Sequence, residues 1–189
     1  MPSSSRTRSR PGSSSTRRPS LVVMNSSEAG VSAAQCARTQ CRLATAVLVD
    51  ARGYLLLQER DEHAPVAPLQ WGLVGGHVDP GEDWTEAVWR ELREETGLDA
   101  DVVPDLRLWR EVELVHAPKG DPALTDRWQV WVGTTTATDV DVVLGEGRQI
   151  VFVDPDSVRA GRLDLAPGAA TILRELLESQ EYAVLAGGR

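Results

Sequence analysis

Residues 76–98 read GHVDPGEDWTEAVWRELREETGL, a glycine-rich loop followed at once by a long charged segment. Neither proline nor glycine interrupts residues 82–96, so this segment is predicted to be a helix. Asp83, with Glu86 three residues later, forms an aspartate version of the capping box at its start. Gly97 suits the left-handed conformation that ends many helices. The stretch therefore predicts a loop, a helix and a defined stop.

Three glutamates on this helix, Glu91, Glu94 and Glu95, are spaced i, i+3 and i+4, so their carboxylates share one face. Bare carboxylates this close repel one another, and a hard cation such as Mg²⁺ removes the repulsion. Arg90 and Arg93 offer another explanation, because they can neutralise the acids as surface ion pairs worth about 0.3–0.5 kcal/mol each. The helix alone leaves both interpretations open.

The loop before the helix favours the metal site. Gly75 and Gly76 permit close approach of the backbone, so that a carbonyl oxygen can turn toward an ion. Glu82 adds a further acid where the loop enters the helix. Such a site suits Mg²⁺, which binds a few carboxylates together with waters and substrate phosphate oxygens.

The flanking sequence predicts a sheet and a second helix. Residues 43–49 and 53–59 are apolar runs separated by a short polar turn, which is typical of a β-hairpin. Further strands are predicted at 71–74, 106–115, 128–136 and 149–153, and an amphipathic helix at 168–177. This order of elements indicates an α/β fold, namely an α/β/α sandwich on a mixed β-sheet.

Composition is that of an ordinary globular protein. The 189 residues are 41% hydrophobic and 25% charged, which fits one domain with one core. A formal net charge of -8 argues against binding a nucleic-acid polymer, because such a surface repels phosphates. The longest apolar runs, such as ATAVLV before Asp50, fall far short of the ~20 residues that span a bilayer. We therefore expect no nucleic-acid polymer, no membrane and a cytoplasmic location.

The two cysteines, Cys36 and Cys41, precede the first predicted strand. Two thiols cannot assemble a framework of several disulfides or a four-cysteine zinc site. We predict that they are free thiols in a reducing compartment.

The ends of the chain are predicted to lie outside the folded domain. Residues 1–38 are rich in arginine and serine and poor in acids, which predicts a disordered extension. A transit peptide and a twin-arginine signal at Arg17 and Arg18 are alternatives, although the apolar stretch that follows is too short for export. The folded domain is predicted at residues 39–180 and a flexible tail at 181–189.

Residues 76–98 resemble the Nudix box. That motif is a Gly, five residues, Glu, seven residues, then Arg-Glu-aliphatic-x-Glu-Glu-x-Gly-aliphatic, and each defined position is matched here. A looser resemblance to MutT-like members extends over about residues 42–177. It implies a Nudix fold and a pyrophosphohydrolase that cleaves a nucleoside diphosphate linked to a group X. Such substrates include nucleoside triphosphates, oxidised ones among them, and nucleotide sugars.

The resemblance also implies roles for the residues of the motif. The implied metal ligands are the carbonyl of Gly75 and the carboxylates of Glu91, Glu94 and Glu95. Mg²⁺ is the implied cofactor, with Mn²⁺ as a substitute. Arg90 and Glu82 correspond to a supporting salt bridge that holds the glutamates in place.

Attack of water on phosphorus needs a base, and two acids are the main candidates. Glu91 can accept the proton as a ligand beside the attacking water. Glu146, in a Gly-Glu-Gly loop, matches a late acid that family members often place opposite the box helix, with an ordinary turn residue as the alternative. Glu111 and Glu113, on a predicted strand, are weaker candidates. The predicted catalytic set is Arg90, Glu91, Glu94 and Glu146.

Substrate phosphates need a cation or a hydrogen-bond donor, and Arg60 and His77 are the candidates. Arg60 ends the strand LLLQER, where MutT-like members often present a phosphate-contacting arginine; an exposed strand-end arginine is the alternative. His77 follows the glycines and can contact phosphate or simply face solvent. Arg127 and Arg148 have no positional support.

Two further features concern the walls of the site. Trp109, Trp128 and Trp131 can stack a base, although aromatic residues on strands more often belong to the core. Members with a W-x-L-P-G-G approach have proline where this chain has Val74. The change loosens the loop and leaves the glycine carbonyl and the carboxylates in place.

Two other functions remain as alternatives. A Nudix-fold isomerase relies on an active-site cysteine, yet Cys36 and Cys41 both precede the predicted core. A non-catalytic nucleotide-sensing domain is expected to have lost acids of the box, which this chain retains. The expected partner is a small-molecule nucleotide, and a homodimer is left open.

Overall fold

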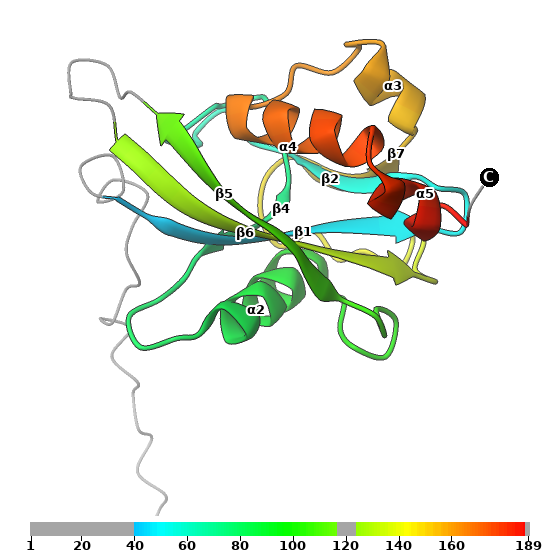
Figure 1. Cartoon of the computed structure of the whole chain (residues 1–189), viewed down its shortest axis with the longest axis horizontal. Helices are drawn as coiled ribbons and strands as arrows, with labels where there is room; N and C mark the ends of the chain where they lie inside the picture. The colour runs from blue at the N-terminus through cyan, green and yellow to red at the C-terminus, as the bar shows by residue number, and fades with distance from the viewer. Residues whose placement is uncertain (1–39, 117–123, 188–189) are drawn as a thin grey trace, which may run out of the picture.

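The computed structural model describes residues 40–116 and 124–187 (Figure 1). The predicted disordered extension at residues 1–38, with Cys36, lies outside these ranges.

Seven strands in the described ranges form one sheet. They are β1 (Arg42–Asp50), β2 (Leu55–Glu59), β3 (Trp71–Gly72), β4 (Val74–His77), β5 (Arg107–His116), β6 (Leu124–Thr135) and β7 (Gln149–Val153). Hydrogen-bonded neighbours follow the order β3-β2-β1-β6-β5, with β4 also beside β1 and β7 also beside β2. β1 and β6 run parallel and the other pairs run antiparallel, so the sheet is mixed, as predicted.

Helices cover both faces of this sheet (Figure 1). They are α2 (Trp84–Thr96), α3 (Pro155–Arg159), α4 (Pro167–Leu177) and α5 (Gln180–Leu185). Helix α2 lies on one face, whereas α4 and α5 pack on the other. The predicted α/β/α sandwich is therefore confirmed.

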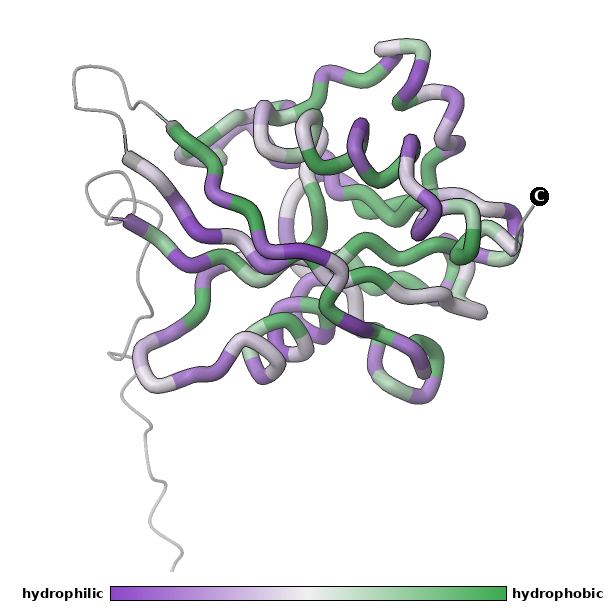
Figure 2. The backbone as a smooth tube through the Cα atoms, viewed as in Figure 1, coloured by the Kyte–Doolittle hydropathy of each residue, from purple (hydrophilic) through white to green (hydrophobic). Residues whose placement is uncertain are grey.

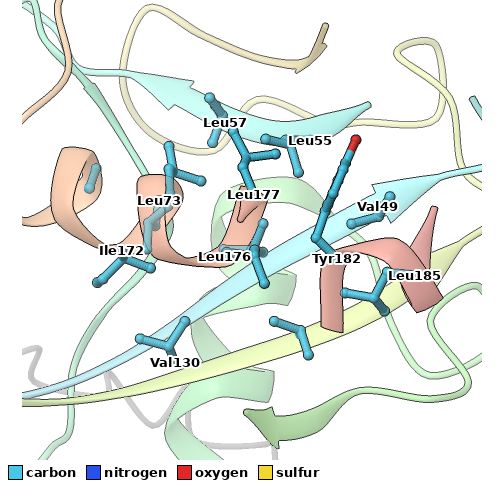
Figure 3. Close-up of a cluster of buried hydrophobic side chains, with 14 residues drawn as sticks. Val49, Leu55, Leu57, Leu73, Val130, Ile172, Leu176, Leu177, Tyr182 and Leu185 are labelled. Carbon is cyan, nitrogen blue, oxygen red and sulfur yellow. The ribbon is translucent and has the colours of Figure 1, made fainter. Parts of the chain in front are cut away.

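The core fills the two layers between the sheet and the helices. On the α4 side, Val49, Leu57 and Val130 of the sheet meet Ile172 and Leu176 of α4 (Figure 3). Burial of each such side chain stabilises the fold by about 1.5–3 kcal/mol. The hydropathy colouring in Figure 2 shows the same arrangement, because the central strands are mostly hydrophobic whereas α2 mixes hydrophobic and hydrophilic residues.

On the opposite face, α2 packs on small side chains. Ala44 and Ala46 of β1 contact Ala87 and Val88 of α2, and all four are buried. Small residues on both partners let the helix backbone approach the sheet closely. This approach brings the glutamates of α2 to the end of β4.

The first hairpin and the caps of α2 follow the sequence prediction. Val49 lies opposite Leu55, which confirms the hairpin of β1 and β2. The Asp83 side chain accepts hydrogen bonds from the backbone of Thr85 and Glu86, and the Glu86 side chain accepts one from the Asp83 backbone. Gly97 ends the helix at φ 71° in the left-handed region. The capping box and the glycine stop are both confirmed.

The predicted flexible tail at residues 181–189 is wrong over its first part. Helix α5 begins after Ser179, whose hydroxyl accepts a hydrogen bond from the backbone of Tyr182. Tyr182 and Leu185 are buried in the core, and the Tyr182 hydroxyl donates to the Gly53 carbonyl at 2.8 Å. A helix of this length is too short to show periodicity in sequence, which is also why α3 was not predicted.

The prediction of free thiols is wrong for Cys41. This residue is buried immediately before β1 and is disulfide-bonded. Its backbone N–H donates to the Asp126 carboxylate at 2.9 Å, so it belongs to the packed domain.

Within the described ranges, no helix is long and apolar enough to cross a membrane.

Candidate functional site

Gly75 and Gly76 lie in strand β4, not in a loop as the sequence suggested, and they pack against β1 with no room for side chains. Gly75 pairs with Thr45 and Gly76 with Ala44 across the β1–β4 ladder. Gly75 adopts φ 126°, and a Cβ there would lie 2.3 Å from the Ala44 carbonyl oxygen. Only glycine satisfies both the backbone angle and the close approach. The sequence feature that predicted a close approach therefore has a direct structural basis.

Glu91 reaches from α2 onto this loop. A Cβ on Gly76 would lie 2.7 Å from Glu91 Oε1 and 2.9 Å from Oε2, so the carboxylate rests on the glycine itself. The Glu91 side chain is 14% exposed. Burial raises the pKa of Glu91, the hydrogen bond from Arg90 opposes that rise, and the charges of Glu94 and Glu146 add to it. The Glu91 carboxylate is thus partly shielded from solvent.

Glu95 lies deeper than Glu91. It is 5% exposed, and its Oε2 accepts a hydrogen bond from the Gly75 N–H at 2.9 Å. Burial raises the pKa of Glu95 to about 8, and the negative charges of Glu91 and Glu146 contribute to the rise. A carboxylate with such a pKa lacks enough compensating positive charge. A cation bound beside it supplies that charge.

Arg90 forms ion pairs with three acids, Glu82, Glu91 and Glu94. Its Nε and Nη2 donate to the two carboxylate oxygens of Glu82 at 2.9 Å each. Nη1 donates to Glu91 Oε1 at 2.8 Å and to Glu94 Oε2 at 3.1 Å, and Nη2 donates to the His77 carbonyl at 2.9 Å. All five N–H donors of the guanidinium are therefore used. Arg90 lowers the pKa of Glu82, so this pair stays ionised.

The acids lie close together, but their side chains do not form a complete set of metal ligands. Within residues 40–116 and 124–187, no group of three or more His, Cys, Asp or Glu side chains converges to hold an ion. The Glu94 side chain is 61% exposed and points to Arg90. Even so, Glu91 and Glu95 fit a hard cation, because both carboxylates have raised pKa values and lie beside the glycines of β4, Glu95 buried and Glu91 partly buried.

The charge of Arg60 acts on both Glu95 and His77. The positive charge of Arg60 lowers the pKa of Glu95 and of His77, so its guanidinium is near both. The Arg60 Nε is buried and has no hydrogen-bond partner among the described residues. The indole N–H groups of Trp128 and Trp131 are also buried without a partner, but the Arg60 donor carries positive charge and therefore fits a bound anion. Burial lowers the pKa of His77, which keeps its ring neutral near pH 7.

Glu146 is brought to the same place by a turn that leans on α2 and β2. Its charge raises the pKa of both Glu91 and Glu95. The preceding Gly145 donates its N–H to the Glu95 carbonyl at 2.9 Å. The structure thus brings Glu146 together with the glutamates of the helix, although the two segments are about fifty residues apart in sequence.

Other predicted candidates lie in ordinary surface pairs. Glu111 accepts hydrogen bonds from Gln129 at 2.6 Å and from Arg127 at 3.3 Å, across the β5–β6 ladder. Glu113 is exposed opposite Arg127 on the same ladder. Arg148 pairs with Glu59 at 3.4 Å. None of these contacts links them to the helix glutamates.

Trp109, Trp128 and Trp131 are partly buried and pack against the core, as their position on strands favours. Trp109 and Trp128 pack against the cluster beneath α4, and Trp131 packs against the cluster beneath α2. Val74, which stands where the W-x-L-P-G-G approach has proline, is buried as the first residue of β4 and pairs with Ala46. The loop therefore keeps its register without proline.

Two polar residues near the site were missed in the sequence. Gln58 is 1% exposed within the otherwise apolar strand β2, and its amide reaches the Glu146 carbonyl at 3.4 Å. Asp126 is buried at 9% exposure, and its charge raises the pKa of His77 against the effect of burial. The signal for Gln58 was a polar side chain inside the apolar run LLLQE.

A wide groove runs along the solvent side of α2 and does not coincide with the glycine loop. Its volume is about 690 Å³, and Trp89, Arg93 and Asp101 are among its lining residues. It touches the acidic site only through Glu82 and Arg90. The buried carboxylates, rather than this groove, mark the place where chemistry can occur.

Comparison with known proteins agrees with this geometry. A family model described as a NUDIX domain matches residues 40–176. The nucleoside triphosphatase NudI of Salmonella agona (strain SL483) is 42% identical over 62 residues, which cover 33% of this chain and 43% of that protein. The chain thus spans less than half the length of the curated relatives it matches.

Solved structures share the fold. The MutT protein of Methanosarcina mazei Go1 has a TM-score of 0.57 at 22% identity, covering 75% of this chain and 97% of that one. The NUDIX domain of Shewanella oneidensis NrtR, solved in complex with ADP-ribose, has a TM-score of 0.59 at 17% identity, covering 75% and 88%. Identities this low show a common fold and nothing finer.

Proposed function

The chain belongs to the Nudix family, and on this premise we propose that it is a Mg²⁺-dependent pyrophosphohydrolase acting on a nucleoside diphosphate linked to a group X. The observation that carries the proposal is the buried carboxylate of Glu95 and the partly buried carboxylate of Glu91, both beside the Gly75–Gly76 backbone. Two such groups with raised pKa values are costly unless a cation and an anionic substrate complete the site.

We assign the metal to the Gly75 carbonyl and to Glu91, Glu94 and Glu95, with Mn²⁺ as a substitute for Mg²⁺. When bound, the ion polarises a phosphoryl oxygen and makes water a better nucleophile. Glu94 is now hydrogen-bonded to Arg90 and is exposed, so a change of side-chain rotamer can bring it to the ion. The contacts of Arg90 with Glu82 and with the His77 carbonyl hold α2 against residues 77–82.

Two acids are our candidates to take the proton of the attacking water. Glu91 is one, because its raised pKa brings it nearer to neutrality, where proton transfer is efficient. Glu146 is the other, because its charge acts on both buried glutamates. The phosphates of the substrate would bind Arg60, whose buried Nε has no partner among the described residues, and neutral His77 can donate or accept one hydrogen bond.

Two kinds of substrate are the first to test. A nucleoside triphosphate is suggested by the relative named as a nucleoside triphosphatase, and a nucleoside diphosphate linked to a sugar is suggested by the fold neighbour that binds ADP-ribose. A net charge of -8 disfavours binding of a nucleic-acid polymer. A small anionic substrate can bind only where a local cation offsets this charge.

The isomerase alternative loses support in the structure. Cys41 is buried, disulfide-bonded and bound through its backbone to Asp126, so its sulfur is not a nucleophile facing the glutamates. Cys36 lies outside the described residues. The retained acids Glu91, Glu94 and Glu95 count against the sensing-domain alternative, and a measurement of activity separates it from the hydrolase, since both need a nucleotide site.

The test is a hydrolysis screen with Mg²⁺, using nucleoside triphosphates, dinucleoside polyphosphates, ADP-ribose and nucleotide sugars. The wild-type protein should release a phosphate-containing product from at least one class, and chelation of the metal should stop the reaction. Binding of a nucleotide without turnover in the presence of Mg²⁺ or Mn²⁺ would favour the sensing domain instead.

A further inference from the structure

Gln58 is a fully buried polar side chain in the middle of an apolar strand. It is 1% exposed, and the three residues before it in β2 are buried leucines. Burying an amide is unfavourable unless it makes hydrogen bonds. Its Nε2 donates to the backbone carbonyl of Glu146 at 3.4 Å, and this contact links β2 to a turn far along the chain.

The turn at residues 145–147 is wedged between α2 and β2 by its two glycines. A Cβ on Gly145 would lie 1.9 Å from the Glu94 carbonyl oxygen, and a Cβ on Gly147 would lie 2.7 Å from the Glu59 carbonyl oxygen. Gly147 also needs φ 81°. The backbone on either side of Glu146 is therefore seated on the end of α2 and on the end of β2.

The Glu146 side chain has no such support. Glu146 is exposed, and its carboxylate accepts no hydrogen bond from any residue that the structure describes. Nevertheless the residue lies beside the end of α2, because the N–H of the preceding Gly145 donates to the Glu95 carbonyl at 2.9 Å, and the charge of Glu146 acts on Glu91 and Glu95. The backbone must set where this carboxylate lies, and the amide of Gln58 is the one side-chain contact to the Glu146 backbone in the described ranges.

We propose that Gln58 is a positioning residue that holds the Glu146 carbonyl, so that the Glu146 carboxylate faces Glu91 and Glu95. This inference rests on the proposed function, because it gives Glu146 a role in hydrolysis. Gln58 does not touch the substrate or the metal and acts through Glu146 alone.

The experiment compares Gln58→Met, which keeps the volume and removes the amide, with Glu146→Gln and with the double variant. Gln58→Met should lower kcat about tenfold with KM within twofold, as expected when a group needed only in the transition state is displaced. In the Glu146→Gln background the same substitution should change kcat no further, because the residue through which it acts has gone.

The matched control is Gln149→Met. Gln149 lies on β7 next to β2 and donates its amide N–H to the Glu59 carboxylate at 2.7 Å, and its side chain makes no hydrogen bond to Glu146 in the part of the chain that the structure describes. This variant should keep kcat within twofold of the wild type. Hydrogen exchange of the amides at residues 144–148 should become faster in Gln58→Met and stay unchanged in Gln149→Met.

Each outcome decides the matter. An equal loss of kcat from Gln58→Met with and without Glu146 would show a merely structural role, and unchanged exchange in the turn would show that the contact holds nothing. If Gln58→Met fails to fold, Gly147→Ala displaces the turn from Glu59 while Gln58 remains, and it should give the same pattern. If the wild type hydrolyses no substrate, the proposed function fails, whereas the exchange data still decide whether Gln58 holds the turn.

Discussion

Arg90 grips both carboxylate oxygens of Glu82, with Nε and Nη2 each 2.9 Å from an oxygen. This pair connects the loop at residues 77–82 to α2, because the same guanidinium also binds the His77 carbonyl. Bidentate arginine–carboxylate pairs are among the stronger hydrogen-bonded contacts in proteins. The pair therefore fixes the angle at which the helix presents its glutamates.

Arg90→Lys should impair both stability and activity. Lysine carries one point charge and cannot form the planar two-bond contact, so the free energy of unfolding should fall by about 1.5–3 kcal/mol. Activity should fall about 10–100-fold, because the groups that support a metal site are disturbed. Urea unfolding and steady-state kinetics measure the two effects.

The control for Arg90 is Arg93→Lys on the same helix. Arg93 is exposed and its side chain forms no ion pair among the described residues. This variant should match the wild type in both measurements. A similar loss in the two variants would mean that helix propensity, rather than the Glu82 contact, explains the result.

Glu95→Gln should separate metal binding from folding. The amide can keep the hydrogen bond from the Gly75 N–H, so the protein should stay folded. Loss of the buried negative charge should lower kcat with Mg²⁺ by about two to three powers of ten. Glu62→Gln, an exposed acid in the loop after β2, is the control and should leave kcat unchanged. Wild-type activity in Glu95→Gln would return Glu95 to a structural role.

Stability without metal should fall as pH rises through the range where Glu95 titrates. The pKa of Glu95 is raised from 4.5 to about 8, so the folded protein keeps a proton that the unfolded chain has released. The stability from this group is fully present below pH 4.5 and is lost as pH rises toward 8. Glu82, whose pKa is lowered, acts in the opposite sense and only at more acidic pH.

Urea unfolding in the presence of a chelator, at several pH values between about 5 and 8, measures this slope. Wild-type protein should lose stability across the range, and Glu95→Gln should show a flatter dependence. Identical slopes would indicate that Glu95 is ionised in the folded state.

Gly76→Ala should displace Glu91 with little effect on the rest of the fold. The added Cβ would lie 2.7 Å from Glu91 Oε1, so the carboxylate must move away. A misplacement of about 1 Å in an active site can cost about a hundredfold in rate, and kcat should fall by that order. Gly72→Ala is the matched control, because its Cβ would meet no atom within 4 Å. Equal kcat in both variants would show that the position of Glu91 does not affect the reaction.

The C-terminal helix should contribute to stability through Leu185. This side chain is 5% exposed in the core beside Tyr182, and Leu185→Ala should lower the free energy of unfolding by about 2–5 kcal/mol. Val184 in the same helix is 60% exposed, so Val184→Ala should cost little. Thermal and urea unfolding measure the two losses. Equal stabilities of Leu185→Ala and Val184→Ala would show that Leu185 does not pack in the core.

Much of the fold was readable in local patterns. The limits of α2 followed from Asp83, Glu86 and Gly97, because caps act within a turn of the helix that they end. Strand β7 was predicted with its observed limits, since apolar runs bounded by turns carry their own signal. Short α5 escaped prediction because only contacts with distant Gly53 and the core stabilise it.

The sequence by itself determined which residues can form the site, since the spacing of Glu91 and Glu95 on a helix and two glycines before it follow from local geometry. Tertiary structure alone decided how these groups behave. The raised pKa of Glu95 comes from burial against β4, and the nearness of Glu146 comes from a turn seated on α2 and β2. Burial and long-range contacts depend on how distant segments pack, and no local pattern encodes them.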